Sequence, residues 1–118
     1  MRTLVACLCA EWCGSCRDYR ATFAALQAQF AADADFAWID VEDDADALGD
    51  PDIDDFPTLL IADDAALRFF GPVTPQAQTA ERLVHEALAG DLTQVGDEAL
   101  VERVRALVRG RNGDLTGA

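Results

Sequence analysis

The chain has 118 residues, which is enough for a single domain with one modest hydrophobic core. Hydrophobic residues make up 51 % of the composition, and this content excludes wholesale disorder. The formal net charge is −13, and all nine cationic residues are arginines, so nucleic acid and anionic lipid are excluded as natural partners of this surface. A basic patch on a protein would be attracted to it instead.

The first half of the chain predicts a strand, a helix and a second strand. Residues 3–10 are short and apolar and are bounded by charge, as is typical of a buried strand. Residues 13–32 carry large apolar side chains at spacings of three and four, which is typical of a helix. Residues 36–41 predict the second strand. The aspartate-rich stretch that follows, residues 42–55, is interpreted as a short helix or a turn.

The second half predicts a hairpin and two helices. Residues 57–62 and 66–70 read as two strands joined by a turn at Asp63-Asp64, and the hairpin ends at Gly71-Pro72. Thr74-Pro75 is typical of an N-cap followed by proline at the first helical position, and Gly90 predicts the end of that helix. Residues 96–110 carry a clean apolar stripe and predict a final helix.

The order of these elements predicts an α/β domain. A βαβ crossover makes the first two strands parallel, and the hairpin adds an antiparallel pair. We expect residues 1–90 to form the domain, residues 91–110 to form an amphipathic helix packed on it, and residues 111–118 to fray. The stripe of the last helix allows a second interpretation, a dimer or partner contact. We expect a monomer, with a homodimer as the alternative.

Sequence signals for targeting are weak. The apolar run before Cys7 is far shorter than the roughly 7–15 residues of a signal h-region, and no run approaches transmembrane length. We therefore expect a cytoplasmic protein without membrane contact.

All four cysteines lie within the first sixteen residues of the chain. Such clustering points to local redox or metal chemistry rather than to a disulfide scaffold, which would join distant segments. A site that uses all four sulfurs could bind zinc or an iron–sulfur cluster. The spacing Cys-x-Cys-x3-Cys-x2-Cys lacks the usual metal-binding knuckle, however, so we expect neither a metal nor another cofactor.

Cys13 and Cys16 form a Cys-x-x-Cys motif between a predicted strand and a predicted helix. The first cysteine would lie at the helix N-terminus, where unpaired N–H groups and the helix dipole stabilise a thiolate. This thiolate is the nucleophile of disulfide exchange. The second cysteine, one helical turn further on, could attack the mixed disulfide and release the substrate.

The motif and its surroundings resemble the thioredoxin family. The resemblance rests on Ala10-Glu11-Trp12-Cys13-Gly14-Ser15-Cys16-Arg17, on Phe56-Pro57-Thr58-Leu59 and on Gly71, and it spans roughly residues 4–88. It implies a thioredoxin-like fold: a minimal βαβ-ββα core with a central four-stranded mixed sheet, here extended by a C-terminal helix. It also implies a cis peptide bond at Pro57. The implied substrate groove consists of Trp12, Gly14, Ser15, Phe56, Pro57 and Gly71.

The chain also departs from the family pattern. It begins where the second strand of thioredoxin would, so the first strand and helix have no counterpart. Ser15 replaces the usual proline, which favours a more oxidising disulfide. Cys7 occupies the place of the buried aspartate of the family, and Trp38 that of its lysine partner. Asp54 and Asp55, just before the Pro57 loop, would raise the pKa of Cys13 if they face it.

The alternation of Cys7 and Cys9 along a strand points both side chains to one face, which the resemblance puts behind Cys16. They are either two small buried hydrophobic side chains, or Cys7 is an auxiliary thiol that pairs with Cys16 or accepts its proton.

These features predict a thiol–disulfide oxidoreductase that exchanges electrons with protein disulfides through Cys13 and Cys16, with an unidentified upstream reductant. The alternative is a non-catalytic interaction module or redox sensor in which the same pair controls the binding of one partner.

Overall fold

The computed structural model describes residues 3–10, 14–42, 56–63, 66–74, 76–90, 92 and 98–116. Its elements in chain order are β1 (Thr3–Cys9), α1 (Gly14–Phe30), β2 (Ala34–Asp40), β3 (Thr58–Ala62), β4 (Leu67–Pro72), α3 (Ala77–Ala89) and α4 (Glu98–Thr116). The helix or turn predicted within residues 42–55 falls mostly on residues 43–55, which lie outside the described residues.

The predicted fold class is confirmed. The four strands form one mixed sheet in the order β2-β1-β3-β4. β1 runs parallel to β2 and antiparallel to β3, and β3 runs antiparallel to β4. The helix α1 provides the crossover between the two parallel strands, as such a pair requires.

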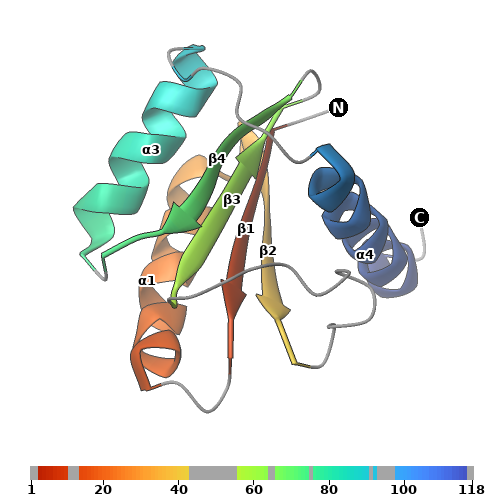
Figure 1. Cartoon of the computed structure of the whole chain (residues 1–118), viewed down its shortest axis with the longest axis horizontal. Coiled ribbons are helices and arrows are strands. Elements are labelled where there is room, and N and C mark those ends of the chain that lie inside the picture. The colour runs from red at the N-terminus through yellow and green to blue at the C-terminus, as the bar shows by residue number, and fades with distance from the viewer. Residues whose placement is uncertain are drawn as a thin grey trace.

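Helices cover both faces of this sheet. Figure 1 shows α1 and α3 on one face and α4 on the other. The alternation of side chains along β1 explains the arrangement, because successive residues of a strand point to opposite faces. Val5, Cys7 and Cys9 pack in the cluster with α1 and α3, whereas Leu4 and Leu8 pack in the cluster with α4.

The α1 and α3 face holds most of the large aromatic side chains. Tyr19, Phe23 and Phe30 are at most 4 % exposed and lie on the side of α1 that meets the sheet. The rings of Phe36 and Trp38 on β2 contact Phe23 edge-on, at centroid distances of 5.6 and 5.8 Å. The predicted apolar spacing along α1 thus corresponds to its buried side.

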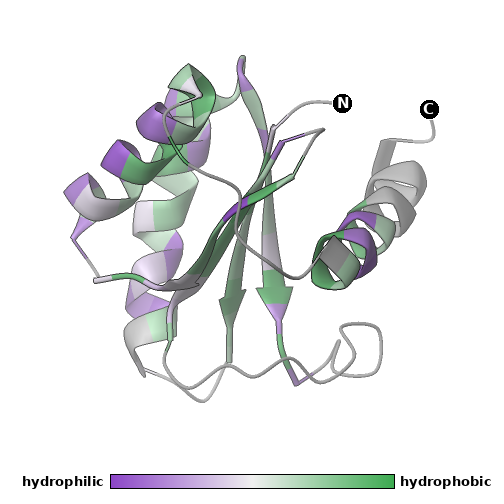
Figure 2. Ribbon diagram, turned by 45° about the horizontal axis from the view of Figure 1, so that its top comes forward, coloured by the Kyte–Doolittle hydropathy of each residue, from purple (hydrophilic) through white to green (hydrophobic). Residues whose placement is uncertain are grey.

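The α4 face is aliphatic and contains one buried cation. Leu100, Val101 and Val104 are at most 5 % exposed, and Figure 2 shows hydrophobic residues of α4 on the side toward the sheet. Arg105, at 9 % exposure, donates hydrogen bonds from Nη2 to the backbone oxygens of Asp63, at 2.8 Å, and Ala62, at 3.4 Å. These bonds attach α4 to the end of β3.

Two helix boundaries differ from the sequence prediction. The N-cap of α3 is Gln76 rather than Thr74, whose hydroxyl instead lies 2.6 Å from that of Thr79. The Thr74-Pro75 pair predicted the region in which the helix begins, but not the residue at which it begins. α4 continues past Gly110 to Thr116, because a glycine within a helix costs only about 1 kcal/mol and does not by itself end it. Gly90, in contrast, does end α3, with φ of 80°.

Within the part of the chain that the structure describes, none of the helices is long and apolar enough to cross a membrane.

Candidate active site

Three segments that are distant in sequence meet at one end of the sheet. Leu8 near the end of β1 is paired with Thr58 at the start of β3, and Thr58 is paired with Pro72 at the end of β4. The Val73 N–H donates a hydrogen bond of 3.0 Å to the Pro57 carbonyl. The Phe56–Pro57 peptide bond is cis, as the resemblance implied. This end of the sheet therefore combines the end of β1, the cis-proline segment and the β4 corner.

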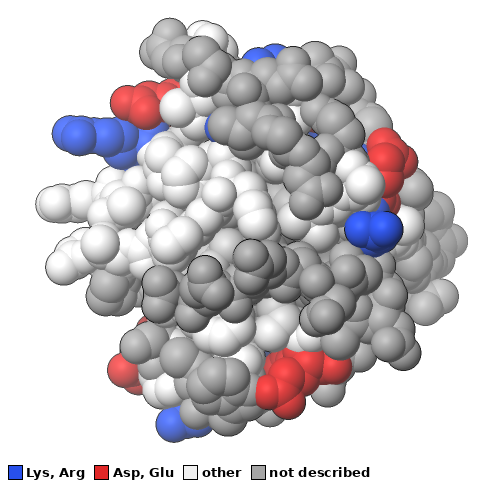
Figure 3. All heavy atoms as spheres, in the orientation of Figure 1, with Lys and Arg blue, Asp and Glu red and all other residues white. Residues whose placement is uncertain are grey.

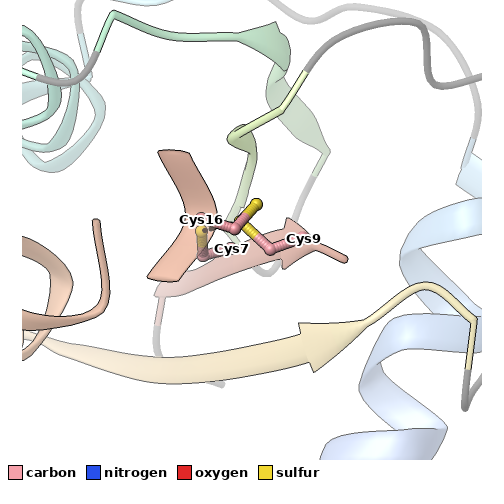
Figure 4. Close-up of a disulfide and its surroundings, with 3 residues drawn as sticks. All are labelled: Cys7, Cys9 and Cys16. Atoms are coloured by element: carbon pink, nitrogen blue, oxygen red, sulfur yellow. Dashed lines mark hydrogen bonds between the residues drawn. A yellow bond between two sulfur atoms is a disulfide. The ribbon is translucent and has the colours of Figure 1, made fainter. Parts of the chain in front are cut away.

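A disulfide between Cys9 and Cys16 lies at this end (Figure 4). Cys9 is the last residue of β1, and Cys16 lies in the first turn of α1, with a Cα–Cα distance of 5.7 Å between them. This distance is within the ordinary range for disulfides. Both side chains are only 1 % exposed. Of the two alternatives for Cys7, a small buried side chain and an auxiliary thiol that pairs with Cys16, the structure shows the first, because Cys7 is buried and free. Cys9 is the residue that is bonded to Cys16.

Cys7 is a free thiol, fully buried beneath this disulfide. Its Sγ lies 3.7 Å from the Sγ of Cys9. Because a disulfide sulfur carries no hydrogen, Cys7 is the donor of this weak S–H···S hydrogen bond. Burial raises the pKa of the Cys7 thiol to about 12, so it stays protonated at neutral pH and is a poor nucleophile.

Tyr19 also faces the cysteine cluster. It follows Cys16 by three residues on α1 and therefore lies on the same side of the helix. Its side chain is 1 % exposed, and its hydroxyl has no hydrogen-bond partner among the described residues. Burial, with a smaller contribution from the nearby Cys7, raises the pKa of Tyr19 to about 12. The surroundings of the disulfide are consequently apolar and uncharged on the core side.

The opposite side of Cys16 is cationic. A small hollow of about 40 Å³ is lined by Ala10, Cys16, Arg17, Arg20 and Trp38. The Arg20 guanidinium lies over the Trp38 ring, 4.9 Å from its centroid, as a cation–π pair. The resemblance implied that Trp38 stands at the position of the family's lysine, and in this chain the Arg20 guanidinium lies beside that tryptophan. A cation beside Cys16 favours the thiolate that is released when its disulfide breaks.

The sequence analysis named Arg17 only as part of the motif and did not name Arg20, although a signal for Arg20 was present. Arg20 follows Cys16 by four residues, and side chains four apart lie on one side of a helix. Arg20 was therefore a candidate neighbour of the reactive sulfur as soon as the helix was predicted.

The structure describes part of the predicted site. Trp12 and Cys13 lie outside the described residues, and so do Asp54 and Asp55. Gly14 is exposed at the first position of α1, and Ser15 follows it, with only its backbone described. Pro57 is buried and Phe56 partly buried, and Gly71 is paired with Leu59 near the end of β4. The structure thus brings Cys16, Phe56, Pro57 and Gly71 to one end of the sheet.

A surface groove of about 510 Å³ adjoins this end, between β4 and α3. Its lining is Phe69, Pro72, Val73, Thr74, Gln78, Thr79, Arg82 and Leu83. Figure 3 shows mainly uncharged atoms on the side where β4 and α3 lie, although the chain as a whole is strongly acidic. The groove therefore offers apolar and hydroxyl contacts, and Arg82 is the one charged side chain among the described residues that line it.

Among the residues that the structure describes, no group of three or more His, Cys, Asp or Glu side chains is arranged to hold a metal ion.

Comparison with known proteins agrees with this fold. The sequence model of the thioredoxin family matches residues 2–85, so the chain belongs to the thioredoxin family. The comparison with curated proteins gives no match. Family membership and the cysteine pair support thiol–disulfide redox chemistry in general.

Solved structures of thioredoxins share the fold at low identity. The germline-specific thioredoxin Deadhead of Drosophila melanogaster is 16 % identical, with a TM-score of 0.64 over 72 % of this chain and 80 % of its own. Thioredoxin of Trypanosoma brucei brucei is 17 % identical, with a TM-score of 0.64 over 75 % and 76 %. Oxidised mitochondrial thioredoxin 3 of Saccharomyces cerevisiae is 21 % identical, with a TM-score of 0.62 over 71 % and 77 %.

Proposed function

We propose that this protein is a thiol–disulfide oxidoreductase that exchanges electrons with protein disulfides through Cys13 and Cys16. The observation that carries the proposal is the position of Cys16, in the first turn of α1, at the same end of the sheet as the cis Phe56–Pro57 bond. Its sulfur is bonded to a neighbouring cysteine there, which supports a role for Cys16 in disulfide exchange.

The proposed reaction has two steps. The Cys13 thiolate attacks one sulfur of the substrate disulfide, a mixed disulfide forms, and the other substrate sulfur leaves as a thiolate. Cys16 then attacks the Cys13 sulfur, so that the Cys13–Cys16 disulfide forms and the second substrate sulfur leaves. Arg17 and Arg20 stabilise the Cys16 thiolate for this second attack because they line the hollow beside its sulfur. An upstream dithiol reductant restores both thiols.

Substrate binding would use the surface beside this pair. An extended polypeptide could contact Phe56 and Pro57 and continue into the groove between β4 and α3. The charge of −13 supports protein partners with basic surfaces rather than nucleic acid.

Reduction of insulin disulfides by the full chain, with dithiothreitol as electron donor, tests the proposal. We expect turnover by the wild type and its loss in Cys13→Ser, while Arg103→Gln on α4, far from the cysteines in sequence, serves as a matched surface control. Equal turnover in Cys13→Ser and the wild type would contradict the proposed mechanism.

The alternative function, a redox sensor or interaction module, is favoured by one specific observation. In the Cys9–Cys16 bonded state the second cysteine of the motif is held by a buried partner. Reversible oxidation without insulin turnover would support this alternative.

A further inference from the structure

We propose that Cys9 is a third redox-active cysteine, which competes with Cys13 for the sulfur of Cys16 and so gives the oxidised protein two interconverting disulfide forms. The inference rests on the proposed exchange through Cys13 and Cys16 and extends it to a residue outside the Cys-x-x-Cys motif. The inference is drawn from the disulfide between Cys9 on β1 and Cys16 on α1 (Figure 4).

The backbone brings Cys9 to Cys16 independently of the Cys-x-x-Cys motif. Cys9 is the last residue of β1, and its carbonyl accepts a hydrogen bond of 2.8 Å from the Val41 N–H, so its main chain is tied to β2. Cys16 is held by α1, which packs on the same face. Cys7 points to this face as well, but it lies two residues further from the end of the strand, and its thiol stays free.

The conversion between the two forms is an internal thiol–disulfide exchange. The Cys9 thiol gives its proton to solvent and attacks the Cys16 sulfur of the Cys13–Cys16 disulfide. The Cys9–Cys16 bond forms, the Cys13–Cys16 bond breaks, and Cys13 leaves as a thiolate. The number of disulfides is unchanged, so the step needs neither an oxidant nor a reductant. The first disulfide comes from the substrate through the proposed function.

The surroundings of Cys9 support the reverse exchange, in which the Cys9–Cys16 bond breaks and the Cys13–Cys16 bond forms again. When Cys13 attacks Cys16, Cys9 must leave as a thiolate in a buried place, where the charge is costly. The protonated Cys7, with its sulfur 3.7 Å away, can donate a hydrogen bond to that thiolate. On the other side of Cys16, Arg17 and Arg20 provide positive charge.

The two forms differ in what they can do with a substrate. In the Cys9–Cys16 form, both bonded side chains are 1 % exposed, so external thiols have little access to the disulfide. Cys13 can still form a mixed disulfide, but Cys16 has no free thiol to resolve it. The internal exchange therefore changes a two-cysteine catalyst into a protein that retains its partner.

Peptide mapping of the oxidised wild-type chain tests the inference. The protein is oxidised with insulin as the disulfide, and its free thiols, including the buried Cys7, are blocked with N-ethylmaleimide in urea. The chain is then cut with trypsin and a glutamate-specific protease. Glu11 separates Cys7 and Cys9 from Cys13 and Cys16, so a Cys9–Cys16 bond links residues 3–11 to residues 12–17. A Cys13–Cys16 bond leaves the two peptides separate.

We expect the linked peptides in the wild type, with N-ethylmaleimide on Cys7 and Cys13, and their loss in Cys9→Ser. Cys7→Ser, the matched control on the same strand, should keep the link. As a second measurement, Cys13→Ser oxidised with diamide should lose the thiols of Cys9 and Cys16 but not that of Cys7. A wild type that contains only Cys13–Cys16 overturns the inference, and so does a Cys13→Ser variant that retains all three thiols.

Failure of the inference is distinguishable from failure of the proposed function. Cys9→Ser keeps both cysteines of the motif, so its insulin turnover reports on the proposed function alone. Turnover by this variant with no linked peptides in the wild type overturns only the inference. Loss of the Cys9 and Cys16 thiols in diamide-treated Cys13→Ser, without insulin turnover by the wild type or by Cys9→Ser, overturns the proposed function and leaves the Cys9–Cys16 bond in place.

Discussion

On one face of β1, Leu4, Ala6 and Leu8 pack against aliphatic residues of α4, whereas on the other face Cys7 and Cys9 pack against α1 beside Cys16. Both faces are equally buried, since each of these β1 side chains is at most 2 % exposed. The difference is chemical. The α4 face contributes apolar burial and the Arg105 hydrogen bonds, whereas the α1 face places sulfur atoms close enough to react.

The two faces of β1 therefore have different roles: one contributes to stability, and the other contributes to disulfide chemistry. Substitutions on the α4 face should lower the free energy of unfolding and leave disulfide exchange intact in the folded protein. Substitution of Cys16, which α1 places against the other face, should stop disulfide exchange.

The largest effect is expected from Cys16→Ser. Without the resolving sulfur, the mixed disulfide between Cys13 and a substrate should persist, and insulin turnover should fall by about 10³-fold. Intact mass measurement of the covalent adduct, together with an insulin reduction assay, checks this prediction. Turnover within a few-fold of the wild type would show that Cys16 does not resolve the mixed disulfide.

Leu100→Ala on α4 tests the opposite face. Leu100 is 1 % exposed and lies in the aliphatic cluster, so its truncation should lower the free energy of unfolding by about 3 kcal/mol. Urea unfolding measures this change. Insulin turnover per folded molecule should equal that of the wild type. A loss of turnover in the folded variant would show that the α4 face also contributes to disulfide exchange.

Alkaline pH should lower the free energy of unfolding through the buried thiol of Cys7. Cys7 is neutral in the folded protein up to a pKa of about 12, whereas in the unfolded chain it ionises near its ordinary value of 9.0. Unfolding between these pH values therefore releases a proton. The contribution of Cys7 to stability is fully present below pH 9 and is lost at about 1.4 kcal/mol per pH unit as the pH rises toward 12.

Urea unfolding of the oxidised protein between pH 8 and pH 11 measures this loss, and Cys7→Ala should make it shallower. The remaining slope would include Tyr19, whose pKa is also raised to about 12 by burial. If the free energy of unfolding depended on pH in the same way in the wild type and in Cys7→Ala, the loss of stability could not be assigned to Cys7.

The smallest effect is expected from Arg20→Gln. The guanidinium lies over Trp38 at the rim of the hollow beside Cys16, and Arg20 is an exposed residue, so solvent screens its charge. Its removal should slow the resolution of the mixed disulfide by about threefold, because a smaller fraction of Cys16 is ionised. Stopped-flow measurement of product release checks the rate, and the same substitution at Arg103 on α4 should leave it unchanged.

Local sequence patterns predicted most of the fold. The apolar run of residues 3–10 and the apolar spacing between Tyr19 and Phe30 corresponded to β1 and α1, since both patterns reflect which side chains the core buries. The cis bond at Pro57 followed from the resemblance and not from the residues themselves. The start of α3 was misplaced by two residues because the turn before a helix does not determine its register.

The partner of Cys16 could not be predicted from the same patterns. Alternation puts Cys7 and Cys9 on one face, but it does not say which of them lies beside α1. That choice depends on where β1 ends and on how α1 packs against the sheet, which are tertiary properties. The same holds for Arg20, whose contact with Trp38 requires both the rotation of α1 and the neighbouring position of β2.

Thiol counting in glutathione buffers of graded potential, with intact mass to separate internal disulfides from glutathione adducts, tests the central claim that exchange takes place at the Cys16 sulfur. We predict that the wild type forms one internal disulfide reversibly and that Cys16→Ser forms none. Four free thiols in the wild type at every potential, or an unchanged internal disulfide in Cys16→Ser, would contradict the claim.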